Sequence, residues 1–322
     1  MTAADTTGSR ARFSARPTKP VPDRISAPRP AEPIPHTSTL GRGWPTVVCE
    51  PGLGASSAGW SHVRDGIAAL TRVATYDRRG LGGSPANADR RDLTALAADL
   101  ADVITHGCAD GPVVLVGHSL GATLARYLAA IRPDLVAGLV LIDPIPDRWV
   151  LRHARWAAPF GQAAFLAMTG LARLGLIDVA MALPVLSGVT RSSTSPLAVL
   201  SEEDRDVLAE EMRRPLSHTT SRREFTGLLR SQAELRHLDA NPAAPVPLTM
   251  ISGGQTHRLA ARLRRDATEW HAGLVRASPD ARHIVVGDGC HSIPRYRPDL
   301  VADAVAELLG RIRSDRAQRT AR

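Results

Sequence analysis

The sequence contains too few cysteines to form a disulfide framework. Its 322 residues include three, at Cys49, Cys108 and Cys290. A chain of this length buries enough apolar surface to fold without covalent cross-links, so we expect free thiols and a reducing compartment. Hydrophobic residues at 43% and charged residues at 22% are typical of a globular protein.

Long apolar runs are also missing. Residues 1–35 lack the stretch of ~7–15 apolar residues that a secretory signal requires. The most apolar region, residues 165–186, is interrupted by Arg173, Gly175 and Asp178 and cannot supply a membrane span of ~20 residues. We therefore expect no membrane span and a cytoplasmic location.

A strongly charged folded region is the third feature that the sequence lacks, although the net charge is +8. Residues 1–44 carry seven Lys and Arg against three Asp and Glu, and residues 311–322 carry five Arg against one Asp. Each end thus contributes +4, and residues 45–310 balance to zero. Nucleic-acid-binding proteins concentrate basic residues on a folded surface, so we expect no nucleic-acid partner. A weak attraction of the two ends to acidic surfaces is the alternative.

Strand and helix patterns alternate along most of the chain. Residues 1–44 are rich in Pro, Ser, Thr and Arg without apolar periodicity, and we expect a disordered tail there. Helical patterns lie between most of the expected strands, and the last helix is expected over residues 298–313. This alternation favours an α/β fold with a mostly parallel, doubly wound sheet. The expected strands are 45–49, 72–77, 112–116, 136–142, 246–252 and 282–286.

The alternation stops between about residues 145 and 240, where the pattern is helical throughout. We interpret 145–240 as a helical cap inserted into one α/β core, which comprises residues 45–144 and 241–314 and is followed by a basic tail at 315–322. Apolar side chains of the cap are expected either to wall a pocket or to pack the cap on the core. They are Trp149, Trp156, Phe160, Phe165 and Met168.

The segment Gly117-His118-Ser119-Leu120-Gly121 carries the clearest chemical signal. It follows a buried strand pattern and precedes a helix pattern, which is the context of a G-x-S-x-G nucleophile elbow. Such a turn leaves no room for large side chains two residues either side of the serine, hence the two glycines. Ser119 is therefore the candidate nucleophile, and it needs a base to take its proton.

His291 is the candidate base, because it lies between the last strand and the last helix and follows the chain order Ser, Asp, His. His118 adjoins Ser119 in sequence, but its side chain is expected to point away from it and to have a structural role. Six further histidines lie in helical or charged contexts and are expected to be ordinary surface residues. They are His153, His218, His237, His257, His271 and His283.

The acid that would orient the imidazole is less clearly marked. The loop after the strand at 246–252 is its common location, but this loop contains no carboxylate as far as Arg258. Asp143, at the end of the strand at 136–142, is our first choice, with a turn or helix-cap role as the alternative. Asp147 is the second candidate and Asp288 the third.

Two backbone N–H groups are expected to form an oxyanion hole, which stabilises negative charge on a reacting oxygen. Leu120, next to the nucleophile, supplies one of them. Leu53, between Gly52 and Gly54 in the loop after the first expected strand, supplies the other. A simple turn is the alternative for this loop.

Six segments, taken in their order along the chain, resemble the α/β-hydrolase superfamily over about residues 45–314. The resemblance implies the α/β-hydrolase fold with the cap after the sixth strand of the sheet. An acid at the end of that strand resembles the arrangement in some lipases, which supports Asp143. The matching segments are 50–54, 76–84, 117–121, 141–144, 290–291 and 297–300.

The resemblance also has consequences for single residues. It implies structural roles for Asp77 and Arg78 in the loop beside the oxyanion hole. Pro51 replaces the histidine that often precedes the first glycine of the oxyanion loop. The first strands of the family are not recognisable in residues 1–44, so the sheet begins late or its first hairpin is degenerate.

A serine stands at position 119 where the family's epoxide hydrolases and haloalkane dehalogenases carry an aspartate, which implies acyl transfer. We expect a serine hydrolase that cleaves a carboxylic ester or related acyl bond of a small, hydrophobic substrate through an acyl-enzyme. The alternatives are thioesterase, lactonase or amidase activity, or a non-catalytic ligand-binding protein of the same fold. No cofactor or metal site is expected, since the glycines at 80–83 have no accompanying lysine and no dinucleotide spacing.

Overall fold

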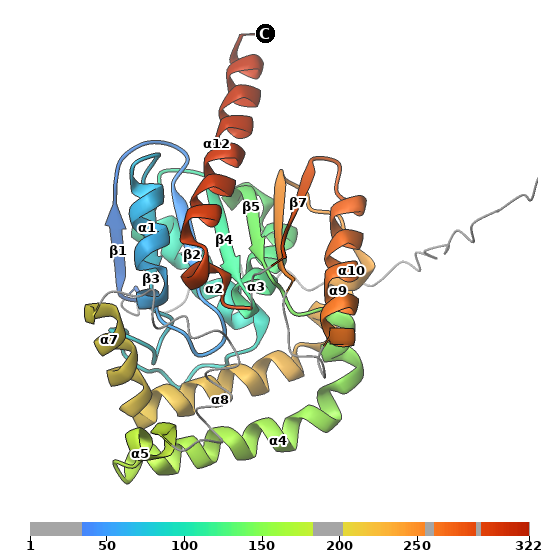
Figure 1. Cartoon of the computed structure of the whole chain (residues 1–322). Coiled ribbons are helices and arrows are strands. Elements are labelled where there is room, and N and C mark those ends of the chain that lie inside the picture. Colours follow the sequence, from blue (N-terminus) through green and yellow to red (C-terminus); the bar gives the residue numbers. More distant parts are fainter. Residues whose placement is uncertain (1–33, 183–201, 255–260, 288–290, 322) are drawn as a thin grey trace, which may run out of the picture.

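The structure, a computed structural model, describes residues 34–182, 202–254, 261–287 and 291–321. Its strands form one sheet in the order β1-β3-β2-β4-β5-β6-β7 (Figure 1). Neighbouring strands from β3 to β7 are parallel, and β1 pairs antiparallel with β3. The strands are β1 (Thr37–Leu40), β2 (Val47–Glu50), β3 (Val73–Tyr76), β4 (Val113–His118), β5 (Val136–Ile142), β6 (Leu248–Gly253) and β7 (Ala281–Val286).

Helices cover both faces of this sheet. In β4, Val113 and Leu115 belong to one buried cluster, and Val114 and Val116 belong to the other. The alternation explains why this strand reads as a continuous apolar run, since both of its faces are covered. On one face lie α2 (Leu93–Asp102), α3 (Leu120–Ile131), α9 (Gln232–Ala240) and α10 (Ala261–Ala277), and on the other lie α1 (Ser61–Ala68) and α12 (Pro298–Thr320).

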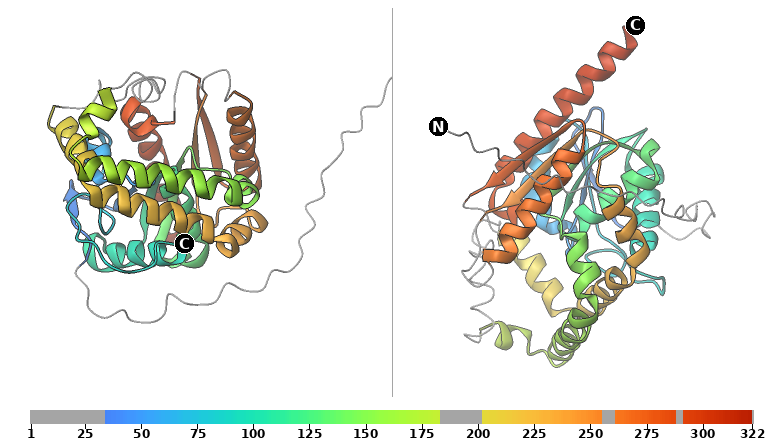
Figure 2. Two further views of the ribbon diagram at one scale, coloured as in Figure 1. Left: turned by 90° about the horizontal axis from the view of Figure 1, so that it is seen from below. Right: turned by 90° about the vertical axis from the view of Figure 1, so that its right-hand side faces the viewer.

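Between β5 and β6 the described chain is helical. Helices α4 and α8 lie side by side across the carboxyl ends of the strands (Figures 1 and 2), where the Phe165 and Phe225 rings are 5.9 Å apart. Leu235 and Leu238 of α9 belong to the buried cluster over the sheet, so this helix packs on the core. The helices ahead of α9 are α4 (Asp147–Arg173), α5 (Ile177–Ala182), α7 (Glu202–Arg213) and α8 (Pro215–Arg230).

Short helical turns complete the described chain. The turn η2 continues α2 as a π-helix, and α11 leads into α12. No helix among the described residues is long and apolar enough to cross a membrane. These shorter elements are η1 (Ser57–Trp60), η2 (Val103–Cys108), η3 (Pro133–Leu135) and α11 (Ile293–Tyr296).

The expected disordered tail over residues 1–44 is wrong for its last part. Residues 37–40 form β1, which pairs with β3 at the edge of the sheet. Three of the four residues of β1 are exposed, so the strand has no apolar pattern in the sequence. With this single strand ahead of β2, the helical insertion follows the fifth strand of the described chain and not the sixth.

The closing helix is longer than expected. Helix α12 continues to Thr320, beyond the expected end at 313 and through most of the expected basic tail at 315–322. Residues 315–320 are all exposed, so no apolar face marks them in the sequence. In Figure 1 this last part of α12 projects away from the body of the molecule.

Candidate active site

The chain turns sharply at Ser119, between β4 and α3. The backbone of Ser119 has φ 55°, a value that residues other than glycine rarely adopt. A Cβ at Gly117 would lie 2.5 Å from the Gly121 carbonyl oxygen, and one at Gly121 would lie 2.3 Å from that of Glu50. The two glycines are therefore required by close backbone contacts, as the sequence predicts for an elbow.

Three of the predicted residues meet at this turn. The Nδ1 of His291 hydrogen-bonds to Oδ2 of Asp143 at 2.6 Å, and its Nε2 lies 3.1 Å from Oγ of Ser119. Ser119 and Asp143 are buried, whereas the His291 side chain is 46% exposed and can be reached from solvent. With Nδ1 donating to the carboxylate, Nε2 carries a lone pair that can accept the serine proton.

Asp143 directly follows β5, and like Ser119 it has a positive φ, 47°. The Nη1 of Arg264, on α10, donates to its two carboxylate oxygens at 2.6 and 2.7 Å, and the Gly253 N–H donates at 3.3 Å. Burial alone would raise the pKa of this carboxyl. The hydrogen bonds and charges of His291 and Arg264 outweigh burial and hold its pKa below the ordinary range, so Asp143 is a carboxylate near neutral pH.

Asp147 does not take part in this arrangement. It begins α4, is fully buried, and forms an ion pair with Arg126 of α3 at 2.9 Å. Asp288, the third candidate, lies outside the described residues. Of the two candidates whose positions are described, Asp143 contacts His291 and Asp147 pairs with Arg126 instead.

His118 contacts the loop that carries the imidazole. Its Nε2 hydrogen-bonds to the carbonyl oxygen of His291 at 2.8 Å, and the two rings are 4.8 Å apart. Burial, reinforced by the neighbouring His291, lowers the pKa of His118 to about 3. It is thus neutral near pH 7, donates from Nε2, and fixes the backbone of His291.

Two histidines expected at the surface are buried, so that expectation is wrong for His218 and His271. His271 takes part in a chain of hydrogen bonds beneath the site. Its Nε2 lies 2.8 Å from the Pro144 carbonyl oxygen and its Nδ1 lies 2.8 Å from Oγ of Ser252. That hydroxyl also lies 2.8 Å from Nε2 of His283. The chain ties β6, β7 and α10 to the residue after Asp143. His257 lies outside the described residues.

The candidate oxyanion donors lie on adjacent elements. Leu120 is the first residue of α3, where backbone N–H groups have no partner within the helix. Leu53 follows β2, whose end is pressed against Gly121 as described above. The elbow and the Leu53 loop are therefore in backbone contact.

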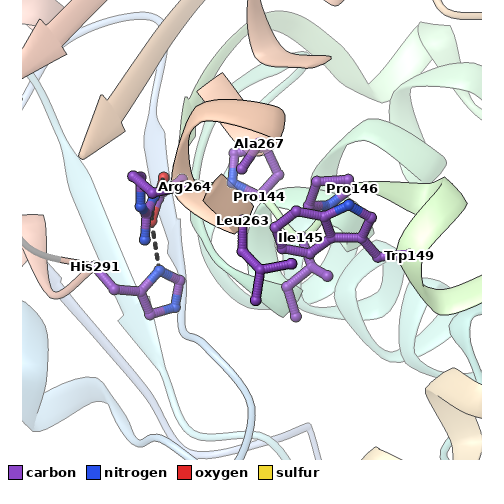
Figure 3. Close-up of a pocket in the computed structure, with 9 residues that line it drawn as sticks. Pro144, Ile145, Pro146, Trp149, Leu263, Arg264, Ala267 and His291 are labelled. Atoms are coloured by element: carbon purple, nitrogen blue, oxygen red, sulfur yellow. Dashed lines mark hydrogen bonds and ion pairs between the residues drawn. The ribbon is translucent and has the colours of Figure 1, made fainter. Parts of the chain in front are cut away.

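A hollow of about 500 Å³, including its open mouth, adjoins Asp143 and His291 (Figure 3). Ile145 and Trp149 form part of its apolar wall. Trp156 and Phe160 do not: they are 72% and 77% exposed on the outer side of α4, while Phe165 packs against Phe225. The residues around the hollow are Asp143, Pro144, Ile145, Pro146, Trp149, Leu263, Arg264, Ala267 and His291.

Within the described ranges no group of three or more His, Cys, Asp or Glu side chains could hold a metal ion. Two residues near the site were not singled out in the sequence. Arg264 and Glu224 occupy helices with several other charged side chains, where they look like solvated residues. Their spacing gave no signal that either one pairs with a buried group.

The sequence profile of the alpha/beta hydrolase fold family matches residues 45–295. The chain is similar to the lipase LipV of Mycobacterium tuberculosis, with 48% identity over 75 residues (22% of this chain, 27% of LipV). It is also similar to the AB hydrolase superfamily protein YfhM of Bacillus subtilis, with 26% identity over 285 residues (85% and 93%). The chain thus spans well under two thirds of LipV's own length.

Solved structures share the fold. The epoxide hydrolase CorEH superposes with a TM-score of 0.65 at 22% identity, covering 86% of this chain and 95% of that one. A thermophilic esterase from Thermogutta terrifontis gives a TM-score of 0.58 at 21% identity, covering 86% and 93%. At these identities the likeness concerns the fold alone.

The buried imidazole of His271 makes stability depend on pH. Burial lowers its pKa to about 4, against ~6.5 in an unfolded chain. Above ~6.5 the ring is neutral in both states; as the pH falls toward 4 the unfolded chain binds the proton first, so stability is lost. We expect His271 to lower the free energy of unfolding by roughly 2 kcal/mol as the pH falls from about 7.5 to about 5. Urea unfolding at both pH values would measure the loss. If stability depends on pH in a His271→Gln variant as it does in wild type, the expectation is contradicted.

Gly121→Ala tests the close contact at the elbow. The added methyl meets the Glu50 and Pro51 carbonyl oxygens at 2.3 and 2.5 Å, so the end of β2 has to move, and we expect a loss of ~1–3 kcal/mol. Gly170→Ala is the matched control, because a Cβ there, in the last turn of α4, meets nothing within 4 Å. The control is expected to gain ~0.4–1 kcal/mol. Thermal unfolding of both variants distinguishes them, and equal effects would refute the contact.

Proposed function

The chain belongs to the alpha/beta hydrolase fold family, and from this premise we propose that it is a serine hydrolase acting through an acyl-enzyme. Its substrates are carboxylic esters or related acyl compounds of modest size with an apolar part. The observation that carries the proposal is the relay from Asp143 through His291 to Ser119, with contacts of 2.6 and 3.1 Å.

In the first half of the reaction, Oγ of Ser119 attacks the carbonyl carbon of the substrate while Nε2 of His291 takes the hydroxyl proton. Asp143 holds the imidazole in the tautomer with hydrogen on Nδ1 and stabilises the imidazolium that forms. When the tetrahedral intermediate collapses, His291 gives the proton to the leaving alcohol. The acyl group remains on Ser119.

The second half repeats these transfers with water. His291 takes a proton from water as the water oxygen attacks the acyl carbon. His291 then passes this proton to Oγ of Ser119. The carboxylic acid leaves and the enzyme is restored. In both halves we assign the N–H groups of Leu53 and Leu120 to the developing oxyanion, where one such donor is worth ~10²–10³ in turnover.

The residue at position 119 favours acyl transfer over epoxide opening, although epoxide hydrolases are among the similar proteins. The resemblance described above implies an aspartate at this position in the family's epoxide hydrolases. A serine attached to an acyl group gives an ester, which water activated by His291 can hydrolyse. An ether formed by opening an epoxide would not be hydrolysed in this way.

The hollow beside His291 supports the choice of substrate. Most of its lining is apolar, with Trp149, Ile145 and Leu263 facing it (Figure 3). We therefore assign an apolar acyl or alcohol group to this space.

Replacing the nucleophile tests the proposal directly. Ser119→Ala is expected to lower turnover of p-nitrophenyl acetate and butyrate by ~10⁴–10⁶ and to abolish labelling by a fluorophosphonate probe. Mass spectrometry of the wild-type protein should find one probe molecule, attached to Ser119. A folded wild-type protein that neither reacts with the probe nor turns over esters, thioesters, lactones or amides would instead be a ligand-binding member of the family.

The identity of the acid has its own test. Asp143→Asn is expected to reduce kcat by ~10³–10⁴, because the amide no longer favours hydrogen on Nδ1 of His291. Asp147→Asn removes a buried carboxylate only four residues away and serves as the control, with a small effect on kcat. Steady-state kinetics on one ester compares the two. A larger loss in Asp147→Asn would reverse the assignment.

A further inference from the structure

A cluster of buried charges lies behind the loop that carries Leu53. Glu50 ends β2, Arg78 follows β3, and Glu224 comes from the middle of α8; none of the three is more than 1% exposed. Arg91, also buried, donates to Oε1 of Glu224 at 2.8 Å. Burying charges is costly unless they are paired, and the triad chemistry uses none of these groups. The cluster therefore calls for a function of its own.

The guanidinium of Arg78 joins the carboxylates to the loop. Its Nε and Nη2 donate to Glu224 at 2.8 and 3.0 Å, and its Nη1 donates to Glu50 at 2.5 Å. The same two terminal nitrogens donate to main-chain carbonyl oxygens, Nη1 to Pro51 at 2.8 Å and Nη2 to Gly52 at 2.6 Å. Arg78 thus fixes two consecutive carbonyl groups of the loop.

These bonds determine where the Leu53 N–H points. The Gly52 carbonyl and the Leu53 N–H belong to one planar trans peptide, in which they point in opposite directions. With the carbonyl directed at Arg78, the N–H is directed away from the cluster. The next peptide is fixed as well, because the Gly54 N–H donates to Oε2 of Glu224 at 3.0 Å. Both peptide planes beside Leu53 are therefore held by the cluster.

Glu224 is the part of this cluster that belongs to the helical insertion. Burial would raise the pKa of its carboxyl, but the charge and hydrogen bonds of Arg78 and the charge of Arg91 lower its pKa to about 2. Glu224 therefore remains charged. Helix α8 also approaches the core closely on both sides of Glu224. A Cβ at Gly54 would lie 2.2 Å from Oγ of Ser221, and one at Gly227 would lie 2.0 Å from the Arg91 carbonyl oxygen.

We propose that Glu224 is a positioning residue of the oxyanion hole, which directs the Leu53 N–H through Arg78 and through the Gly54 peptide. The donor is then correctly placed only while α8 is seated on the loop, so this helix, which crosses the carboxyl ends of the strands (Figure 1), forms a working part of the site. This inference rests on the proposed function, because it assumes that the Leu53 N–H stabilises an oxyanion.

The test is Glu224→Gln, which keeps the shape of the side chain but removes its charge. Sulfur is a weak hydrogen-bond acceptor, so a thionoester gains less from the hole than the matched oxygen ester. We expect the variant to lose about 10- to 100-fold in kcat on the ester and only a few-fold on the thionoester. The ratio of the two rates therefore falls, with KM little changed. A purely structural residue would lower both rates together.

Asp147→Asn is the matched control. It neutralises another buried carboxylate between the insertion and the core, paired with Arg126 at 2.9 Å, and no contact joins it to residues 51–54 among those described. We expect a lower Tm in this variant, because it leaves a buried arginine without its charged partner, and an ester-to-thionoester ratio within about two-fold of wild type. Arg78→Lys keeps the charge but loses the planar fork, and it is expected to lower the ratio as Glu224→Gln does.

Hydrogen exchange gives a readout that does not depend on turnover. The amide of Gly54 is expected to exchange at least about ten-fold faster in Glu224→Gln than in wild type, and no faster in Asp147→Asn. An unchanged Gly54 amide, or an unchanged rate ratio in either folded cluster variant, would overturn the inference. If wild type turns over no ester but the Gly54 amide responds, the proposed reaction fails while the control of the loop by Glu224 stands.

Discussion

A positive φ at a serine is the constraint on which the site depends. Such a backbone costs on the order of 1–3 kcal/mol and persists only where its surroundings hold it. Here the Ser119 N–H donates to the Ile142 carbonyl oxygen at 2.9 Å, and the absence of side chains at Gly117 and Gly121 lets the turn close. The contact of Gly121 with the end of β2 also brings the Leu53 loop to the start of α3. One strained turn thus carries the candidate nucleophile and lies against the segment that leads into the Leu53 loop.

Arginines paired with buried carboxylates recur in the elements around that turn. Arg264 of α10 pairs with Asp143 after β5, and Arg126 of α3 pairs with Asp147 at the start of α4. The Arg78 cluster does the same between α8 and the loop after β2. In each case a pair of opposite charges joins a helix to a segment distant in sequence. Because a buried charge without its partner is strongly unfavourable, such pairs fix which segments lie together.

The sequence predicted the parts of this molecule that depend on local pattern. Apolar runs predict β4 and β5, and the two glycines around Ser119 predict the sharp turn that its positive φ forms. Asp143 could be predicted from the sequence because it directly follows the strand beside the one that carries the nucleophile. The sequence could not reveal β1, since three of its four side chains are exposed and show no apolar alternation. The contacts of Glu224 were also hidden, because its partners lie 133 to 170 residues earlier in the chain and a charged helix residue ordinarily faces solvent.

The two ends of the sheet differ in what they offer to an experimenter. Helices α4 and α8 cross the carboxyl ends of the strands, whereas the exposed end of α12 projects from the opposite side of the molecule (Figure 1). A surface, dye or affinity handle attached at the end of α12 is therefore remote from the mouth of the hollow beside His291. Immobilisation through this helix would orient the protein with its candidate active site toward the bulk solution, leaving diffusion of small molecules to that side unobstructed.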